Sequence, residues 1–353
     1  MKTTECSQAS GTSVLSVFSS ITVVLNHEVL KLPMLSKFFM TACSAAVVVL
    51  LTPSLAFAET VVEKVARTGV LTAGVRFMAV PYSYVDDEGN LVGYSIDVLK
   101  LIEDQLEAEL GRDILVNMVP AETETERIPM LTSGEIDIAC DSQFTWARAR
   151  SVDFSVSYSN SGIRVLTRAG SDISTSDSLA GRNVAVFEDS ISKGVLAQAQ
   201  PAANLLTVSS VDAAFAALDE ERVEAIAGDT IFLGGAAAQR GGDEKYQLAL
   251  EQPLDRYGVA CMMPQGNSTF RYMVDYSIAG LAQGYLDGES RYVDIIDNWF
   301  GETGVVPLPQ ASLDDFFESV LVNRALVPPA GAEATETAGA ATETTAPSDA
   351  EAL

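Results

Sequence analysis

The sequence predicts an α/β protein with two lobes, and three observations support this. Segments typical of strands alternate with segments typical of helices at short spacing, which indicates a parallel or mixed sheet covered by helices. At 353 residues the chain can bury a sizeable core, which at this length divides between two lobes. The composition is that of a globular protein, with 48% hydrophobic and 7% aromatic residues.

The first strand and helix patterns lie in the N-terminal third of the chain. The strand LTAGVR (71–76) precedes a helix whose apolar positions recur at helical spacing. These positions are Val98, Leu99, Ile102, Leu106 and Leu110. Ser95 is the expected N-cap of this helix, and Asp97 suits the positive end of its dipole. The strand ILVNMVP (114–120) follows.

A second helix and strand lead into a polar loop. The apolar helix positions are Ile128, Met130 and Leu131, and the alternating strand positions are Ile136, Ile138 and Cys140. Gly134 separates the two elements. Arg148 follows just beyond the strand's carboxyl end, where small ligands bind in open α/β sheets. Because a guanidinium matches a carboxylate with two hydrogen bonds, Arg148 is a candidate carboxylate receptor.

A second set of alternating patterns follows residue 162. Its strand segments are VAVF (184–187), LLTVSS (205–210), EAIAG (224–228) and YQLALE (246–251). Its helical segments are SKGVLAQAQ (192–200), VDAAFAALDEE (211–221) and IFLGGAAAQ (231–239). A further strand, YGVACMM (257–263), and a long helix, TFRYMVDYSIAGLAQGYLDG (269–288), come next. Periodicity alone does not show to which lobe they belong.

Charge and composition exclude several classes of function. The formal net charge of −26 argues against nucleic acid as a partner, because binding phosphates requires a clustered basic surface. The single histidine, His27, lies before the expected start of the mature protein. Without it the Ser-His and Cys-His nucleophile arrangements and imidazole zinc sites are excluded. We expect no cofactor and no metal site, while metal-free carboxylate catalysis remains open.

The two ends of the chain have the composition of processed or unstructured segments. Residues 34–58 have a charged start at Lys37, an apolar run and a small-residue cleavage site at Ala56–Ala58, as in a secretory signal peptide. An uncleaved anchor is the alternative. Residues 1–33 are interpreted as a mis-called start upstream of Met34, or else as a long leader extension. Residues 327–353, rich in Ala, Thr and Glu, are expected to form a disordered acidic tail. We therefore expect a periplasmic protein.

The cysteines allow one disulfide in the exported protein. Cys6 and Cys43 belong to the leader, which leaves Cys140 and Cys261. Two cysteines in an oxidising compartment are candidates for a bridge. Both lie on apolar strand patterns, so a pair of buried free thiols is the alternative.

Five segments in order resemble the bacterial extracytoplasmic solute-binding proteins of family 3, the receptors of polar amino acid ABC transporters. They are VPYSYVDDEGNLVGYSIDV, ERIPMLTSGEIDIAC, ARARSVDFSVSY, LAGRNVAVFEDS and RVEAIAGD. The resemblance covers about residues 61–310, and within the family it is greatest to glutamate/aspartate-binding members.

The resemblance implies a type II periplasmic-binding-protein fold, in which two α/β lobes are joined by two hinge strands. Lobe 1 would be residues 61–162 plus 259–326, and lobe 2 residues 163–258. IRVLTR (163–168) and YGVACM (257–262) would cross between them.

The implied function is capture of one amino acid between the lobes, followed by hinge closure and recognition by a membrane ABC permease. Glutamate or aspartate is the expected ligand, and the protein is expected to be a monomer that is not an enzyme. One alternative is a receptor for another polar amino acid such as glutamine. Another is a cyclohexadienyl or arogenate dehydratase-like enzyme on the same fold, for which Glu188 and Asp189 lie near the predicted cleft.

Two residues match the positions that recognise the ligand's charged α-groups. Arg148, six residues before Phe154 and three after Thr145, matches the family's α-carboxylate arginine, and Arg150 is the competing register. Asp229 matches the acid that receives the α-ammonium, although a helix N-cap is also consistent with its position.

Other matches bear on the ligand's side chain. Arg76 and Arg127 match arginines that contact the side-chain carboxylate in glutamate/aspartate-binding members, although Arg127 could instead pair with a nearby glutamate and Arg76 could be exposed. Tyr82 matches an aromatic residue against the ligand, with core packing as the alternative. Ser142 could bond the carboxylate or cap a turn.

The chain departs from the family at one turn. Where the family has a Gly-Thr-Thr type turn against the α-carboxylate, this chain has Asp189, Ser190, Ile191 and Ser192. Ser190 or Ser192 is the expected substitute for the missing hydroxyl.

Overall fold

The structure is a computed structural model, and it describes residues 59–188 and 190–322. The expectations for the leader (1–58), for Asp189 and for the tail (327–353) concern residues outside these ranges. So do those for His27, Cys6 and Cys43.

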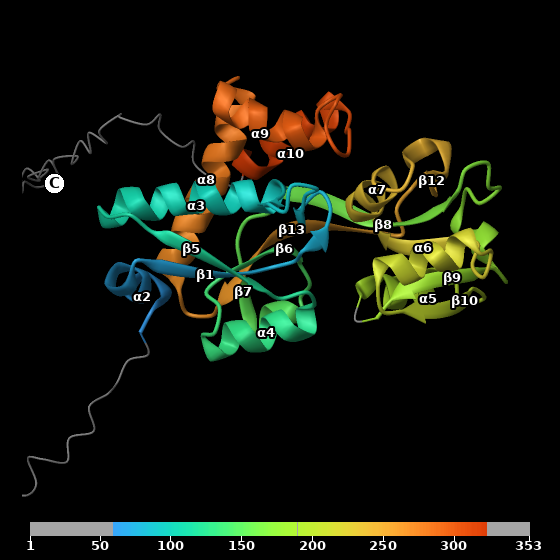
Figure 1. The fold of residues 1–353 in the computed structure, drawn as a ribbon, viewed down its shortest axis with the longest axis horizontal. Coiled ribbons are helices and arrows are strands. Elements are labelled where there is room, and N and C mark those ends of the chain that lie inside the picture. The colour runs from blue at the N-terminus through green and yellow to red at the C-terminus, as the bar shows by residue number, and fades with distance from the viewer. Residues whose placement is uncertain (1–58, 189, 323–353) are drawn as a thin grey trace, which may run out of the picture. The chain divides into compact units, whose positions relative to one another are not determined.

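The first group of elements surrounds a short parallel sheet (Figure 1). Strand β1 (Val70–Val75) pairs in parallel with β5 (Leu115–Pro120), and an Ala73–Ile138 bridge joins β1 to the segment before β6 (Ala139–Gln143). The remaining elements before residue 159 are α2 (Val61–Thr68), β2 (Met78–Ala79), β3 (Ser83–Val85), β4 (Leu91–Val92), α3 (Tyr94–Leu110), α4 (Glu124–Ser133), the short 3-10 helix η2 (Arg148–Arg150) and β7 (Val152–Phe154).

The C-terminal helices return to this first group. They are α8 (Ser268–Leu286), α9 (Ser290–Phe300) and α10 (Gln310–Val322), and α3 packs against both α8 and α9. A single hydrophobic core includes residues from both segments, for example Leu99 and Ile102 of α3 with Phe270 and Ile278 of α8. Burying this apolar surface from water is what brings the two distant segments together.

The second group is built on a stretch of the eight-stranded sheet that also contains β6 and β7, and it has its own helices. Strands β10 (Asn204–Val208), β9 (Asn183–Phe187) and β11 (Ala225–Asp229) run in parallel in that order. The helices are α5 (Ile191–Ala199), α6 (Val211–Asp219) and α7 (Thr230–Ala238), and β12 (Tyr246–Ala249) follows them. Two hydrophobic clusters fill this group, and both consist of residues from 165 to 254.

Two long antiparallel strands belong to both groups. Strand β8 (Ser159–Arg168) pairs with β11 and β12 through its second half, while β13 (Asp255–Pro264) pairs with β6 and β7 through its second half. Their remaining halves pair with each other, from Val259–Ser159 to Asp255–Ile163. Two α/β groups joined by two strands make the predicted type II periplasmic-binding-protein fold, which is thereby confirmed.

Two local expectations were wrong. The N-cap of α3 is Gly93 rather than Ser95, because the chain enters the helix at a φ of 145° and a Cβ at Gly93 would lie 2.1 Å from the Tyr82 carbonyl oxygen. Strand β6 begins at Ala139 rather than Ile136, since the preceding residues make only the bridge from Ile138 to β1.

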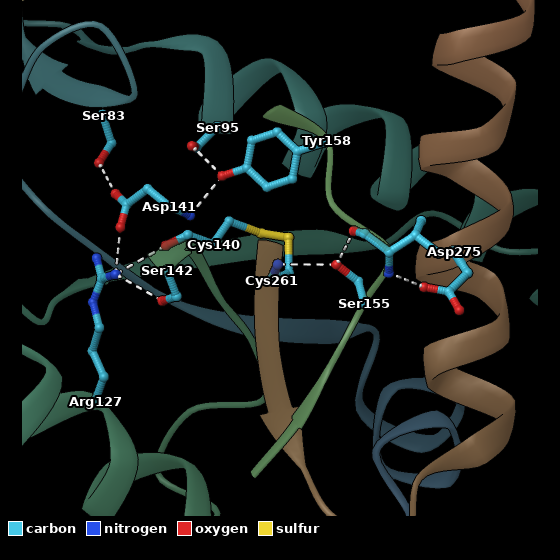
Figure 2. Close-up of a disulfide and its surroundings, with 11 residues drawn as sticks. Ser83, Ser95, Arg127, Cys140, Asp141, Ser142, Ser155, Tyr158, Cys261 and Asp275 are labelled. Carbon is cyan, nitrogen blue, oxygen red and sulfur yellow. Dashed lines mark hydrogen bonds and ion pairs between the residues drawn. A yellow bond between two sulfur atoms is a disulfide. The ribbon is translucent and has the colours of Figure 1, made fainter. Parts of the chain in front are cut away.

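Cys140 of β6 and Cys261 of β13 form a disulfide (Figure 2). Both residues are buried, and 121 positions separate them in the sequence. The bond therefore links β6, in the N-terminal part of the first group, to β13, the strand by which the chain comes back to this group from the second. A cross-link that closes so long a loop restricts the unfolded chain more than a short one does.

Removing this disulfide should lower the free energy of unfolding by about 2–5 kcal/mol. The test is denaturant unfolding of the wild type and of a Cys140→Ala/Cys261→Ala variant. Reductant should lower the midpoint of the wild type and leave that of the variant unchanged. Equal stability of the two proteins without reductant would contradict the prediction.

Candidate functional site

A cavity of about 550 Å³ is lined by residues of both groups. This volume lies within the range of small-molecule pockets. Its charged and polar lining from the first group includes Arg76, Tyr82, Glu124, Asp141, Gln143 and Arg148. Residues Phe187, Ser190, Ser210, Asp229 and Phe232 line it from the second group. The carboxyl ends of β6, β9 and β11 thus lie next to one space, as expected for a ligand site in α/β sheets.

Arg148 is held at the cavity wall by the loop that follows β6. Its backbone N–H donates to Thr145 Oγ1 at 3.1 Å, and its Nη1 donates to the Gln143 carbonyl oxygen at 2.9 Å. The side chain is 11% exposed. Burial lowers the pKa of Arg148, and the charges of Arg76 and Arg127 lower it further against the opposing effect of Glu124. A bound anion would relieve this destabilised positive charge.

Arg150, the competing register, is exposed and does not line the cavity. Thr145 is not in the wall either, and its contribution is to fix the Arg148 backbone.

Asp229 lies at the opposite side of the cavity, where β11 ends and α7 begins. Its Oδ1 accepts from the Phe232 N–H at 2.8 Å, so Asp229 caps α7, and its Oδ2 accepts from the Tyr257 hydroxyl at 2.6 Å. Burial raises the pKa of Asp229, although the hydrogen bonds from Phe232 and Tyr257 lower it in part. Asp229 therefore caps α7 and also lines the cavity, while its role as the acceptor of an α-ammonium group stays a prediction.

Arg127 lies behind the wall rather than in it. Its side chain is fully buried, its Nε donates to the Ala121 carbonyl oxygen at 2.8 Å, and its Nη1 contacts Asp141 Oδ1 and the Cys140 carbonyl oxygen (Figure 2). Asp141, in contrast, does line the cavity. The expected contact of Arg127 with a ligand is thus replaced by a contact with an aspartate of the chain itself.

Asp141 has a backbone conformation that few residues adopt, with a φ of 58°. Its N–H donates to the Tyr158 hydroxyl at 2.6 Å, and Ser83 Oγ donates to its Oδ2 at 2.9 Å (Figure 2). Burial opposes ionisation of the carboxyl group, but Arg127 and Arg76 outweigh it and hold the pKa below its usual value. Asp141 is therefore a fixed negative charge beside the cavity.

Arg76 and Glu124 form the most direct ion pair of the wall. Arg76 Nη2 donates to Glu124 Oε1 at 2.9 Å, and Arg76 Nε lies 3.6 Å from Asp141 Oδ1. Glu124 Oε1 also lies 3.8 Å from Arg148 Nη1. Arg76 is consequently paired rather than solvated, with a side chain that is 25% exposed.

The predicted serines and Tyr82 divide between the wall and the layer behind it. Tyr82 lines the cavity and is also part of the core, so its core packing is confirmed while its contact with a ligand stays a prediction. Ser190 lines the cavity and caps α5 by accepting from the Ser192 N–H at 3.1 Å. Ser192 is buried behind it, with 2.6 Å between the two hydroxyl oxygens. Ser142 is also buried and accepts from Arg127 Nη1 at 3.4 Å.

Reasoning from the sequence did not single out Glu124 or Asp141 as part of the site. The sequence contains one signal for Glu124. It lies three residues before Arg127, at the start of the same helix, where side chains at this spacing are neighbours. For Asp141 the signal was its place directly after the last apolar strand position, at the strand end where ligands bind.

The consensus of the bacterial extracellular solute-binding proteins of family 3 matches residues 71–302. The chain belongs to this family. The resemblance seen in the sequence is thereby confirmed.

Two relatives with stated ligands are similar over most of their length. One is a glutamate/aspartate import solute-binding protein of Salmonella typhimurium, 27% identical over 74% of this chain and 85% of that protein. Another is a glutamine-binding protein of Bacillus subtilis, 28% identical over 61% of this chain and 74% of that protein. Among solved structures, a cysteine-binding protein from Campylobacter jejuni has the same fold, with a TM-score of 0.60 and 21% identity over 72% of this chain and 98% of its own.

In residues 59–188 and 190–322, no helix has the length and apolar character required to cross a membrane. The same ranges hold no group of three or more His, Cys, Asp or Glu residues placed to bind a metal ion.

Proposed function

We propose that this family 3 protein is the extracytoplasmic receptor of an ABC importer, that it encloses one α-amino acid in the cavity, and that it then delivers it to a membrane permease. The observation that carries the proposal is the placement of Arg148 and Asp229 in the wall of one cavity. A zwitterion requires one positive and one negative partner, because an enclosed charge without a partner costs several kcal/mol. A ligand that bridges both groups stabilises a closed state, which the permease then recognises.

Glutamate or aspartate is the first candidate ligand. Arg76 lines the same cavity as Arg148 and offers a second guanidinium to a side-chain carboxylate. The glutamate/aspartate relative from Salmonella supports this choice.

Glutamine is the second candidate, and the ion pair between Arg76 and Glu124 favours it. Glu124 already pairs with Arg76, and Arg127 is held by Asp141, so the excess positive charge expected from three arginines is reduced. The glutamine-binding relative from Bacillus supports this alternative.

The proposed role is binding without catalysis. A dehydratase would require a carboxylic acid next to the leaving hydroxyl group. Among the five acids that line the cavity, Asp141 is held ionised beside Arg127, Glu124 is paired with Arg76, and Glu122 accepts from the Phe77 N–H. The exposed Glu188, and Asp229, whose pKa is raised by burial, are the remaining candidates for the acid of such an enzyme. Turnover of prephenate or arogenate would contradict the binding role.

Calorimetry of the mature protein against the twenty amino acids tests the proposal. We expect micromolar or tighter binding, about −8 kcal/mol, of glutamate, aspartate or glutamine. Binding of none of the twenty would refute the receptor function.

N-terminal sequencing of the exported protein tests the signal peptide, with a mature start near Glu59 expected.

Binding should weaken as the pH falls, because Asp229 must be ionised to pair with the ligand's ammonium group. Since burial raises the pKa of Asp229, its protonation and the loss of affinity should begin at a higher pH than for an ordinary aspartate. The measurement is the affinity for glutamine, whose side chain does not titrate, between pH 4 and 7. An Asp229→Asn variant should bind more weakly and lack this pH dependence. A wild-type affinity that is constant over the range would contradict the assigned role.

A further inference from the structure

The charges around Arg76 are nearly balanced before any ligand is bound. Arg76, Arg127 and Arg148 each lie within 4.0 Å of Glu124 or Asp141. Three positive and two negative formal charges leave one positive charge. The α-carboxylate of an amino acid at Arg148 would cancel it. A second carboxylate on the ligand would then lack a counter-charge in a largely buried site, which is unfavourable.

Three buried polar atoms of this cluster have no hydrogen-bond partner among the described residues. They are Arg76 Nε, Arg127 Nη2 and Glu124 Oε2. A buried polar group without a partner is unusual in a folded protein and calls for an explanation. Arg127 lies behind the wall, but Arg76 and Glu124 both line the cavity. Arg76 and Glu124 thus present a guanidinium and a carboxylate side by side in the wall, and each side chain has hydrogen-bonding capacity that no described residue uses.

A carboxamide matches this pair of side chains, and a carboxylate does not. Its carbonyl oxygen accepts from a guanidinium N–H, and its NH₂ group donates to a carboxylate oxygen. A carboxylate only accepts, so it would offer the Glu124 carboxylate no donor and would also face a like charge. A cationic side chain would satisfy Glu124 but would lie next to the positive charge of Arg76.

We infer that Glu124 is a specificity-determining residue, which accepts a hydrogen bond from a side-chain carboxamide and disfavours a side-chain carboxylate. The inference rests on the proposed function, because it assumes that the ligand's α-groups bind to Arg148 and Asp229. Glu124 thus sets the relative affinity for ligands with a side-chain amide and ligands with a side-chain carboxylate.

The test is the ratio of the glutamine Kd to the glutamate Kd in the wild type and in a Glu124→Gln variant. The substitution keeps the shape of the side chain, removes its negative charge and presents an amide in place of the acceptor-only carboxylate. We expect the ratio to rise by about tenfold or more, because glutamate no longer faces a like charge. Glu122→Gln is the matched control. Glu122 lines the same cavity but accepts from the Phe77 N–H and has no ion pair with an arginine within 4.0 Å among the described residues. Its substitution should change the ratio by less than about threefold.

The wild type alone provides a second measurement if the variant is unstable. The γ-methyl ester of glutamate is uncharged like glutamine but has no side-chain N–H. If Glu124 requires a donor, the ester should bind about tenfold more weakly than glutamine. Arginine is included to test the cationic alternative.

The outcomes separate the two claims. An unchanged glutamine-to-glutamate ratio in a folded Glu124→Gln protein, or a wild type that binds arginine more tightly than glutamine, overturns the inference and leaves the receptor function intact. A wild type that binds no amino acid overturns the proposed function, and the inference fails with it.

Discussion

An Arg148→Ala variant is expected to lose amino acid binding, with a decrease in affinity on the order of 100-fold or more. The Arg148 guanidinium lines the cavity, and burial together with Arg76 and Arg127 lowers its pKa, so an anion is its favoured partner. Truncating one member of a buried, hydrogen-bonded charge pair costs about 2–5 kcal/mol, and each 1.4 kcal/mol is a factor of ten. Calorimetry with the ligand of the wild type measures the loss.

The matched control is Arg150→Ala, which removes the same side chain two residues away. Arg150 is exposed and outside the cavity wall, so its loss should change the affinity by less than about threefold. A thermal unfolding midpoint close to that of the wild type establishes that the Arg148 variant is folded. If Arg150→Ala abolished binding and Arg148→Ala did not, Arg150 rather than Arg148 would be the arginine that binds the ligand's α-carboxylate.

Much of the fold follows from local patterns in the sequence. Strands such as β9 and β11 and helices such as α3 and α6 have apolar periodicity that is visible in isolation. The start of α3 was missed because it depends on a contact, the approach of Gly93 to the Tyr82 carbonyl, that no local pattern reveals. The return of α8 to the first group likewise results from core packing between segments more than 150 residues apart, and only the resemblance to a family predicted it.

The position of the cavity was predictable from the sequence, but the pairing of charges in and behind its wall was not. Arg148 and Asp229 follow strand ends, and a strand end is a local feature. Whether an arginine faces a ligand or a carboxylate of its own chain depends on which residues lie around it in space. Arg127 and Asp141 are 14 positions apart, and their contact requires that α4 pack beside β6. The sequence shows that both residues are charged but not that they neutralise each other.

Arg127 and Asp141 neutralise each other in a buried ion pair, and the loss of Arg127 has the largest expected effect on stability. Replacing Arg127 with methionine should lower the free energy of unfolding by about 3–5 kcal/mol at pH 7, because it removes the main partner of the buried Asp141 carboxylate. Methionine fills much of the space of the arginine side chain and brings no charge. Denaturant unfolding of the variant and the wild type measures the difference. A double variant with Asp141→Asn should recover part of the loss, since it removes the buried charge that was left without its partner.

The pH dependence distinguishes a lost charge pair from a simple packing defect. In the wild type the Asp141 pKa is lowered in the folded state, so its contribution to stability is present above the unfolded pKa of about 3.9 and is lost as the pH falls through the folded value. Without Arg127, the buried Asp141 is easier to protonate, and acid relieves the unpaired charge. The stability difference between the two proteins should therefore narrow between pH 7 and pH 4. A packing defect would give a difference that is the same at both values, and this result would show that the ion pair does not account for the loss.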